Sequence, residues 1–389
     1  MKRLDSKFEE IAASIPSKFT IACLDDWSAV APDVQRLFDQ AEAASFDLGL
    51  DWFRHLAATA MRPATETCIY VVSAMSNGQA VAALPVRRDR GGKQLFSLAN
   101  YYTSLYAPLV RSDDAEPALG ALFAQLLQEN AYFSIALSPM TADHPALAMT
   151  ARALRQAGWR AFEYFCFGNW FLPVAGRSYA QYFDALPSRL RNTIKRKNRQ
   201  FLEHAGGRFE IITGGNALEA AIAAYDTIHQ ARWKKPEPYA EFIPGMIRLY
   251  ASKGQLRLGM AYVHDTPVAA QIWLVAHGRA VIYKLAYDTR HAHLSVGSLL
   301  TNHLMQQVLD QDRVGEIDYL IGDEPYKQDW MSQRRERWGI VAYNPRSWRG
   351  RIAAANESAR RAAKAAYGSL GHAISGLRGV LTQFRQHPR

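Results

Sequence analysis

The feature that most constrains the fold of this chain is a series of hydrophobic periods that occurs twice along its 389 residues. In each copy a strand is followed by two helices, three strands, a helix, a strand, a further helical stretch and a last strand. The first copy ends near Leu172 and the second near Tyr343. A chain that repeats one mixed order of strands and helices is expected to form two similar α/β units, each with a mixed sheet.

The periods place the expected elements as follows. In the first copy, strands are expected over residues 19–24, 68–74, 79–87, 94–99, 133–137 and 161–172, and helices over 27–44, 50–60, 117–129 and 144–157. In the second copy, strands are expected over 208–213, 255–263, 267–276, 279–288, 316–321 and 338–343, and helical segments over 217–233, 239–252, 296–310 and 327–334. A basic helix over 188–204 joins the copies. We therefore predict domains at 1–185 and 186–346, followed by an Ala- and Arg-rich helical tail at 347–389.

The positive charge is concentrated in two segments. The formal net charge is +10, yet residues 187–208 hold seven basic residues against one acid, and residues 346–389 hold nine against one. The rest of the chain is therefore mildly acidic, unlike a uniformly basic nucleic-acid-binding protein. Such patches are solvated faces or contact anionic ligands or lipid. The tail also carries an apolar stripe, so we expect it to dock on the protein or to contact an anionic membrane peripherally.

The three cysteines, Cys23, Cys68 and Cys166, lie far apart in apolar strand-like runs. We expect buried, unreactive thiols in a reducing compartment, with no disulfide scaffold, and the histidines show no metal-ligand spacing. No stretch approaches the ~18 uncharged apolar residues of a membrane span, and the first ten residues do not resemble a signal peptide. The sequence thus predicts a cytoplasmic protein, placed at the inner face of the membrane if its tail binds lipid.

The order of the elements resembles that of the GCN5-related N-acetyltransferase (GNAT) fold, so the two copies resemble a tandem GNAT protein. The second half is similar to acetyltransferases associated with cellulose and exopolysaccharide biosynthesis, which are relatives of the Fem-type peptidoglycan transferases. The likeness is carried by residues 186–191 with 196–199, 228–233, 295–300, and 322–327 with Trp330. Residues 103–109 carry a weaker likeness in the first half.

This resemblance implies an N-acyltransferase that moves an acyl group from acyl-CoA or acetyl-CoA to an amine of a cell-envelope, polysaccharide or lipid precursor. A first alternative keeps the transferase class but takes aminoacyl-tRNA as donor, as Fem-type relatives do, and it is the one case in which nucleic acid is an expected partner. A second alternative is a non-catalytic GNAT-like module that binds partner proteins. The first half is expected to have a structural or acceptor-binding role.

The start of a helix can hold the diphosphate of such a donor, because its first backbone N–H groups lack intrahelical partners. A loop of this kind is formed by His293, Ser295, Val296, Gly297 and Ser298. Gly297 lets the backbone approach a phosphate closely; the alternative is an ordinary capped helix. The corresponding segment 108–117 of the first copy carries three acids, Asp113, Asp114 and Glu116, so only the second copy is expected to bind the donor.

Acyl transfer also requires a base for the amine proton and a donor or charge for the departing thiolate. In a sheet of the GNAT type, the cleft lies at the ends of the central strands, and one such strand is followed by Asp323, Glu324, Tyr326 and Lys327. Either acid is a candidate base, and the tyrosine or lysine is a candidate acid or charge stabiliser. The alternative is a turn with packing aromatics. Asp318, inside the strand, is expected to be a buried acid with partners.

The helix over 217–233 ends with His229, Arg232 and Trp233, and His229 and Arg232 share a face. The resemblance implies that this helix lines the acceptor side of the cleft, so these residues are expected to bind the acceptor. Without the resemblance, this segment is an amphipathic helix end with cationic residues near the C-terminus, where the helix dipole favours them. Tyr106 is a further candidate acceptor residue. With Tyr101 and Tyr102 it forms either an aromatic acceptor wall or loop aromatics that cover the core.

Overall fold

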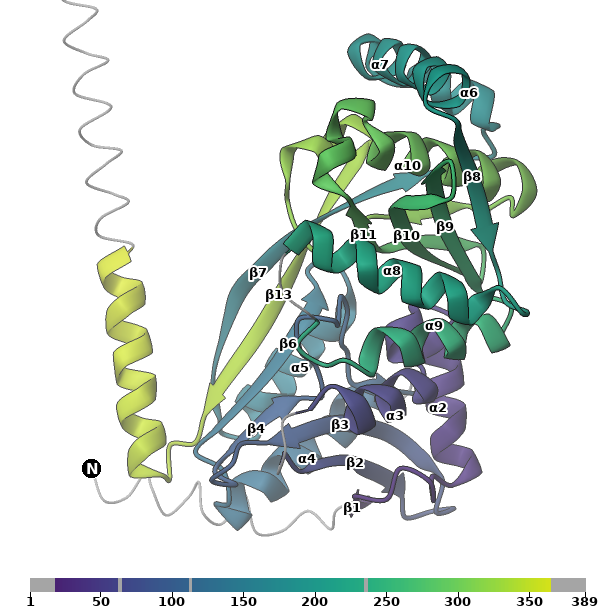
Figure 1. Cartoon of the computed structure of the whole chain (residues 1–389). Coiled ribbons are helices and arrows are strands. Elements are labelled where there is room, and N and C mark those ends of the chain that lie inside the picture. The colour runs from purple at the N-terminus through teal and green to yellow at the C-terminus, as the bar shows by residue number, and fades with distance from the viewer. Residues whose placement is uncertain (1–17, 62–64, 112–113, 234–236, 365–389) are drawn as a thin grey trace, which may run out of the picture.

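The structure is a computed structural model that describes residues 18–61, 65–111, 114–233 and 237–364 (Figure 1). The strands of the first half are β1 (Phe19–Leu24), β2 (Thr67–Ala74), β3 (Ala80–Arg88), β4 (Gln94–Ser97), β5 (Leu109–Val110), β6 (Ser134–Thr141) and β7 (Arg160–Pro173). Its helices are α2 (Pro32–Glu42), α3 (Leu50–Thr59), α4 (Ala115–Glu129) and α5 (Pro145–Gln156). These elements follow the predicted order, with boundaries shifted by a few residues.

The second half repeats this order. Helices α6 (Tyr179–Ala185) and α7 (Ser188–Arg199) lead into β8 (Gly207–Ile212), and the next helices are α8 (Leu218–Trp233) and α9 (Phe242–Ser252). The remaining elements are β9 (Leu256–Val263), β10 (Thr266–Ala276), β11 (Arg279–Tyr287), α10 (Val296–Gln306), β12 (Glu316–Asp318) and β13 (Gln333–Tyr343). The predicted mixed α/β architecture is therefore confirmed, and the order is repeated except that the described residues between β12 and β13 form no α-helix.

All thirteen strands belong to one mixed sheet, in which the last strands of the two halves are exchanged. The order is β1-β2-β3-β4-β6-β13-β7-β12-β11-β10-β9-β8, with β5 on β3. β13 from the second half pairs with β6 of the first, and β7 from the first half pairs with β12 of the second. β7 and β13 also pair with each other along eleven residues of β13. Each half thus completes the sheet of the other, and the boundary at 185/186 stays a proposal.

The second half has a different helix on each face of its sheet. Along β10, Ala270 and Ile272 belong to the core cluster that contains residues of α8, whereas Ala269 and Trp273 belong to the cluster that contains residues of α10. Successive side chains of a strand point to opposite faces, so α8 and α10 cover opposite sides of β9–β11. Figure 1 shows α8 crossing the near side of these strands.

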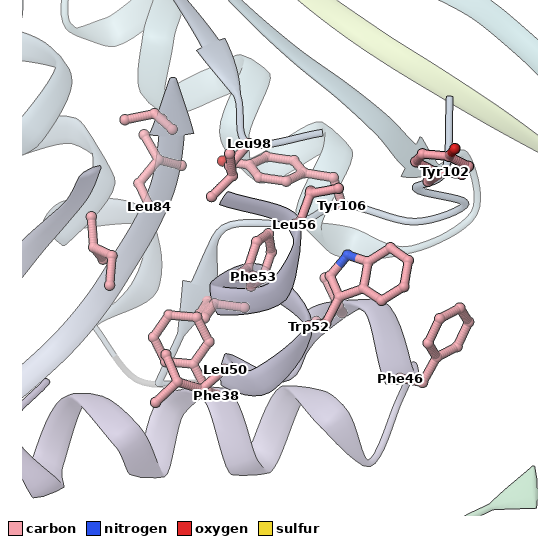
Figure 2. Close-up of a cluster of buried hydrophobic side chains, with 14 of the residues drawn as sticks. Phe38, Phe46, Leu50, Trp52, Phe53, Leu56, Leu84, Leu98, Tyr102 and Tyr106 are labelled. Atoms are coloured by element: carbon pink, nitrogen blue, oxygen red, sulfur yellow. The ribbon is translucent and has the colours of Figure 1, made fainter. Parts of the chain in front are cut away.

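The core on the α8 side continues into the first half. Trp52 of α3 packs edge-on against Phe242 of α9, with ring centroids 5.6 Å apart, and Phe46 packs in the same way against Tyr250 at 5.9 Å. Figure 2 shows the first-half side of this cluster, including Tyr102 and Tyr106. Burying large aromatic side chains contributes strongly to stability, so the halves are joined by a core as well as by strands.

Two elements near the end of the second half differ from the prediction. The strand expected over 316–321 ends at Asp318, because Leu320 and Gly322 take positive φ angles of 54° and 107°. The helical stretch expected over 327–334 is wrong: a short 3₁₀ turn covers Pro325–Asp329, and β13 begins at Gln333. Pairing with β7 extends β13 toward its N-terminus, which local propensity did not reveal.

The described part of the tail, helical over residues 348–364, packs against β7. Arg361 donates a hydrogen bond to the Glu163 carbonyl oxygen at 2.7 Å and lies 5.1 Å from the centre of the Phe162 ring. The rest of the predicted tail, residues 365–389, lies outside the described residues, so the membrane contact assigned to it stays a proposal. No helix within the described ranges is both long and apolar enough to cross a membrane.

Candidate active site

A cavity of about 550 Å³ opens where β11 and β12 part. The two strands pair in parallel over three residues only, Arg279–Val281 against Glu316–Asp318, and then diverge. Residues 282–287 form one wall of the cavity and residues 319–321 the other, while α10 closes one end. A volume of this size is typical of small-molecule sites.

Both halves of the chain contribute to this cavity. Tyr101 and Tyr102 of the first half line it, with ring centroids 4.2 Å apart. Tyr101 is 53% exposed, whereas Tyr102 is buried and stacks on Phe242 at 4.0 Å. Of the two interpretations of these tyrosines, the wall of a cavity therefore describes Tyr101, and Tyr102 serves both the wall and the core.

The first turn of α10 presents unpaired backbone amides at the closed end. Ser295 takes a left-handed conformation with φ 58° and forms no side-chain cap. The first backbone hydrogen bond of the helix is donated by Leu299 N–H to the Ser295 carbonyl at 3.1 Å. The three earlier N–H groups, on residues 296–298, therefore have no intrahelical partner. Gly297 and Ser298 line the cavity.

A buried polar network fixes this turn against β10. The Gln271 side-chain amide donates to the Gly297 carbonyl at 2.9 Å and to Thr301 Oγ1 at 2.8 Å. Its own oxygen accepts a hydrogen bond from Trp273 Nε1 at 2.9 Å. Because every polar atom of Gln271 is engaged, the amide cannot rotate, and the start of α10 is held in one orientation. We had not predicted a role for Gln271; a glutamine inside the apolar run of β10 was the available signal.

The predicted donor-loop residues divide between cavity and surroundings. Gly297 and Ser298 line the cavity, whereas Val296 is buried in the core below them and His293 is exposed to solvent outside the lining. Ser295 contributes the backbone turn, and its side chain is outside the lining. The structure thus brings two of the five predicted residues to the cavity as lining groups.

Lys327 lines the cavity, but its ammonium group is already fully engaged. Its Nζ donates to the carbonyl oxygens of Ile321 at 2.6 Å and Gly322 at 3.4 Å, and it lies 2.8 Å from Glu324 Oε2. An ammonium group has three N–H donors, and all three have partners here. Lys327 therefore shapes the loop that follows β12, and we no longer assign it the role of proton donor.

Tyr326 and Glu324 both line the cavity. Tyr326 is 44% exposed, packs edge-on against Tyr319 at 5.8 Å, and has a pKa raised to about 12 by burial and then by the charge of Glu324. Its hydroxyl therefore stays protonated at neutral pH and can donate. The Glu324 side chain is 55% exposed and can accept a proton. These two predicted catalytic residues lie together at one wall.

Asp323, the other candidate base, lies outside the cavity lining. Its carboxylate accepts hydrogen bonds from Arg334 at 3.0 Å and 2.7 Å and from Trp170 Nε1 at 2.8 Å. The hydrogen bonds from Arg334 are the main reason that the pKa of Asp323 is lowered. A carboxylate held by a bidentate arginine is a weak base. Glu324 is paired with Lys327 through one oxygen, Oε2, and it lines the cavity, which favours Glu324 over Asp323 as the base.

A second lysine, Lys284, lies on the opposite wall, and not all of its N–H donors have an acceptor among the described residues. Lys284 of β11 lines the cavity, and within the described residues its Nζ has one hydrogen-bond acceptor, Glu237 Oε1 at 2.9 Å. Glu237 also accepts a hydrogen bond from the Tyr102 hydroxyl at 2.8 Å. The pKa of Glu237 is lowered, because the Lys284 charge and these hydrogen bonds outweigh its burial. Lys284 was not predicted, although it is the one charged residue inside the β11 core segment.

His229, one of the predicted acceptor residues, contacts Glu237. Its Nε2 lies 3.2 Å from Glu237 Oε1, and burial lowers its pKa, so it is neutral near pH 7. His229 and Lys284 share Glu237 as partner, and His229 is not part of the cavity lining. Arg232 and Trp233 belong to the last turn of α8, but their side chains lie outside the described residues.

Tyr106 fills the position in the first half that corresponds to the cavity. β4 and β6 pair in parallel as far as Phe96 and Ala136, as β11 and β12 do in the second half. Beyond that point, Tyr106 N–H donates to the Pro139 carbonyl at 2.6 Å and its hydroxyl donates to the Pro85 carbonyl at 2.9 Å. Tyr106 is fully buried. Tyr106 thus packs where β4 and β6 part and does not line the cavity, although it was predicted to bind the acceptor.

No cluster of three or more His, Cys, Asp or Glu side chains that could hold a metal ion occurs among the residues that the structure describes. The polar groups of the cavity are amides, hydroxyls, two lysines and one glutamate. This donor set suits anionic and carbonyl groups of an organic ligand.

Comparison with known proteins bears on the fold and on the second half of the chain. Residues 188–328 match the family described as acetyltransferase (GNAT) domain, less than half of the chain. The crystal structure of FemX has a TM-score of 0.51 at 9% identity and covers 75% of this chain and 94% of its own. No curated protein matches the sequence.

Two further solved structures are similar with lower TM-scores. The C-terminal domain of a putative lysylphosphatidylglycerol synthetase from Agrobacterium fabrum has a TM-score of 0.49 at 11% identity, covering 79% of this chain and 92% of its own. A tandem GNAT protein from the clavulanic acid biosynthesis pathway has a TM-score of 0.46 at 14% identity, covering 84% and 99%. The sheet topology, the domain match and the FemX likeness together give the chain a tandem GNAT-type fold, and the domain match indicates a transferase.

Proposed function

We propose that the chain is an N-acyltransferase that takes an acyl group from acyl-CoA or acetyl-CoA in the β11–β12 cavity and passes it to an amine. The acceptor is an amine of a cell-envelope, polysaccharide or lipid precursor. The observation that carries this proposal is the coincidence of the cavity with the unpaired amides of the first turn of α10. Aligned N–H groups at a helix start bind phosphate groups, and the cavity continues from them between two strands.

The chain's own residues supply the groups that acyl transfer requires. When bound, acyl-CoA supplies the thioester. Glu324 accepts a proton from the acceptor ammonium, which leaves a nucleophilic amine. As the carbon–sulfur bond breaks, the Tyr326 hydroxyl, which is protonated at neutral pH, donates a hydrogen bond that stabilises the departing thiolate, and the thiolate then takes its proton from water. Lys284 and Tyr101, on the opposite wall, are available to the acceptor.

The first half supports this assignment by contrast. Its own gap between β4 and β6 holds Tyr106, and α4 begins next to Asp114 and carries Glu116 in its first turn. Acidic side chains repel a diphosphate at a helix start. We therefore assign one donor site to the chain, in the second half, and an acceptor-side and structural role to the first half through Tyr101 and Tyr102.

Replacement of Gly297 by valine is expected to abolish binding of coenzyme A. A Cβ added at Gly297 meets Tyr287 at 3.4 Å, an ordinary contact, so the fold tolerates the change while the branched side chain obstructs the amides. Isothermal titration with coenzyme A should show binding by the original chain and at least a tenfold weaker affinity for Gly297→Val. Gly120→Val, at a helical glycine of α4 with open space around it, is the matched control.

The same titration separates the two donors. Absence of heat with millimolar coenzyme A and folded protein would remove the acyl-CoA assignment. The alternative, an aminoacyl-tRNA donor, is favoured by α7, where Arg189, Arg196 and Arg199 have no acidic partner within the described part of the chain. Binding of tRNA that weakens steeply with salt, without binding of coenzyme A, would establish that donor class.

Substitutions Glu324→Gln and Tyr326→Phe are each expected to lower the rate of acyl transfer by about tenfold to a hundredfold, because water reaches this exposed wall and replaces part of each function. The rate is measured as thiol released from acetyl-CoA with a panel of amino sugars as probe acceptors. Asp323→Asn is the control, since Asp323 lies outside the cavity and should affect transfer less. A measurable rate that is equal in all three variants and the original chain would remove Glu324 and Tyr326 from the reaction.

A further inference from the structure

Two cysteines and an arginine lie close together at the first-half edge of the sheet. Cys23 is on β1, the terminal strand, Cys68 is on β2 and Arg88 is on β3. Cys23 of β1 is paired directly with Tyr70 of β2, and Cys68 lies two residues from Tyr70 on the same strand. Residues two apart on a strand face the same side, so both thiols lie on one face. Cys68 is thus the diagonal cross-strand neighbour of Cys23.

Arg88 is fixed so that it points at the Cys23 sulfur. Its Nε donates to the Tyr132 hydroxyl at 2.9 Å and its Nη1 donates to Glu66 Oε2 at 2.9 Å. A guanidinium group is planar, so these two partners determine where the third nitrogen lies. That nitrogen, Nη2, is 3.5 Å from Cys23 Sγ.

The three cysteines differ in exposure and in acidity. Cys23 is exposed, Cys68 is buried and Cys166 is intermediate. The hydrogen bond from Cys68 and the nearby charge of Arg88 lower the pKa of Cys23 to about 7, against the opposing effect of burial. That hydrogen bond raises the pKa of Cys68, which keeps its proton, and burial raises the pKa of Cys166 to about 11. The expectation that all three thiols are buried is therefore wrong for Cys23, which is exposed, and Cys166 is only partly buried.

We infer that Cys23 is a reactive thiol that exchanges with small disulfides, with Cys68 and Arg88 holding its sulfur as the thiolate. The thiolate attacks one sulfur of the small disulfide, whose sulfur–sulfur bond breaks. Cys23 becomes one half of a mixed disulfide, and the other half leaves as a thiolate that takes a proton from water. The small disulfide is the oxidant, so electrons balance without another reagent. This site is separate from the acyl-transfer cavity, and its test does not depend on the proposed function.

The test uses the aromatic disulfide dithiobis(nitrobenzoate) on the folded full-length chain. At pH 7 one thiol should react fast, mass spectrometry should locate the mixed disulfide on Cys23, and the rate should have its midpoint near pH 7. Cys23→Ser should lose the fast reaction, and Cys166→Ser should retain it. Cys68→Ala should move the midpoint to higher pH and slow the reaction at pH 7 by about tenfold, since a normal thiol has a pKa near 8.5.

Three outcomes would overturn the inference, two of them in the original chain and Cys23→Ser. One is a fast reaction that persists in Cys23→Ser. The other is a pH midpoint in the original chain no lower than that of the same thiol in urea. Because Cys68 is buried, Arg88→Lys provides an independent variant that keeps the positive charge but loses the planar fork, and it should also slow the reaction. An unchanged rate in both Cys68→Ala and Arg88→Lys, with folding verified by circular dichroism, would likewise contradict it.

Discussion

Residues 186–389, expressed without the first half, are expected to aggregate and to show no cooperative unfolding. The cut leaves β7 with the first half, and β12 then loses its antiparallel neighbour. β13, with eleven residues, loses both of its partners, β6 and β7. Long unpaired strand edges promote aggregation. The core on the α10 side also loses Leu172 and Val174.

Co-expression of 1–185 with 186–389 is the control for this experiment. The two pieces contain every strand of the sheet, so they should associate and unfold together in a single transition measured by circular dichroism in urea. A soluble, monomeric 186–389 fragment with a cooperative transition of its own would show that the exchanged strands are dispensable.

Replacement of Asp318 by alanine is expected to lower the free energy of unfolding by about 3–5 kcal/mol, because removing one partner of a buried ion pair deprives its donors of their charged acceptor. Asp318 is buried at the junction of the exchanged strands. Its carboxylate accepts hydrogen bonds from Asn169 of β7 at 2.5 Å and from the Leu320 backbone at 2.6 Å, and it pairs with Arg335 of β13. When Asp318 is removed, Arg335 keeps its ion pair with Glu316 at 3.0 Å and its hydrogen bond to Asn169 Oδ1 at 2.7 Å.

Urea unfolding of the purified variants measures this effect. Asp318→Asn should give an intermediate loss, because the amide keeps hydrogen bonds to its neighbours but removes the charge. Glu219→Ala is the matched control: Glu219 also pairs with an arginine, Arg248, at 2.7 Å, but both side chains are largely solvated, so the loss should be far smaller. Equal losses for Asp318→Ala and Glu219→Ala would mean that the buried network contributes little.

The sequence predicted local properties of the candidate site well. A helix that starts near Val296 after a turn, with Gly297 in its first turn, follows from turn chemistry and hydrophobic period, which act over a few residues. The expectation of Asp318 as a buried acid with partners is confirmed for the same reason, since an acid between apolar neighbours in a strand needs a hydrogen-bond partner.

The roles of residues that depend on neighbours in three dimensions were not predictable from residue type and position in the sequence. Lys327 and Lys284 are both lysines near the cleft, but only in the structure does the loop after β12 use up the donors of Lys327, while Lys284 keeps some free. Tyr101 and Tyr106 lie five positions apart in one loop, yet one faces the cavity and the other fills a gap in the first-half sheet. These differences arise from contacts between residues far apart in the chain.

The sequence by itself determined most of the segments that form strands and helices and the fact that the series occurs twice, because period and composition act locally; residues 327–334 are the exception. Only the tertiary structure decided that β7 and β13 change places. Backbone hydrogen bonds are the same for every residue type, so an alternating strand carries no record of which sheet edge it will join. The partner is chosen by packing across the whole sheet, including the buried pair of Asp318 and Arg335 at the crossing.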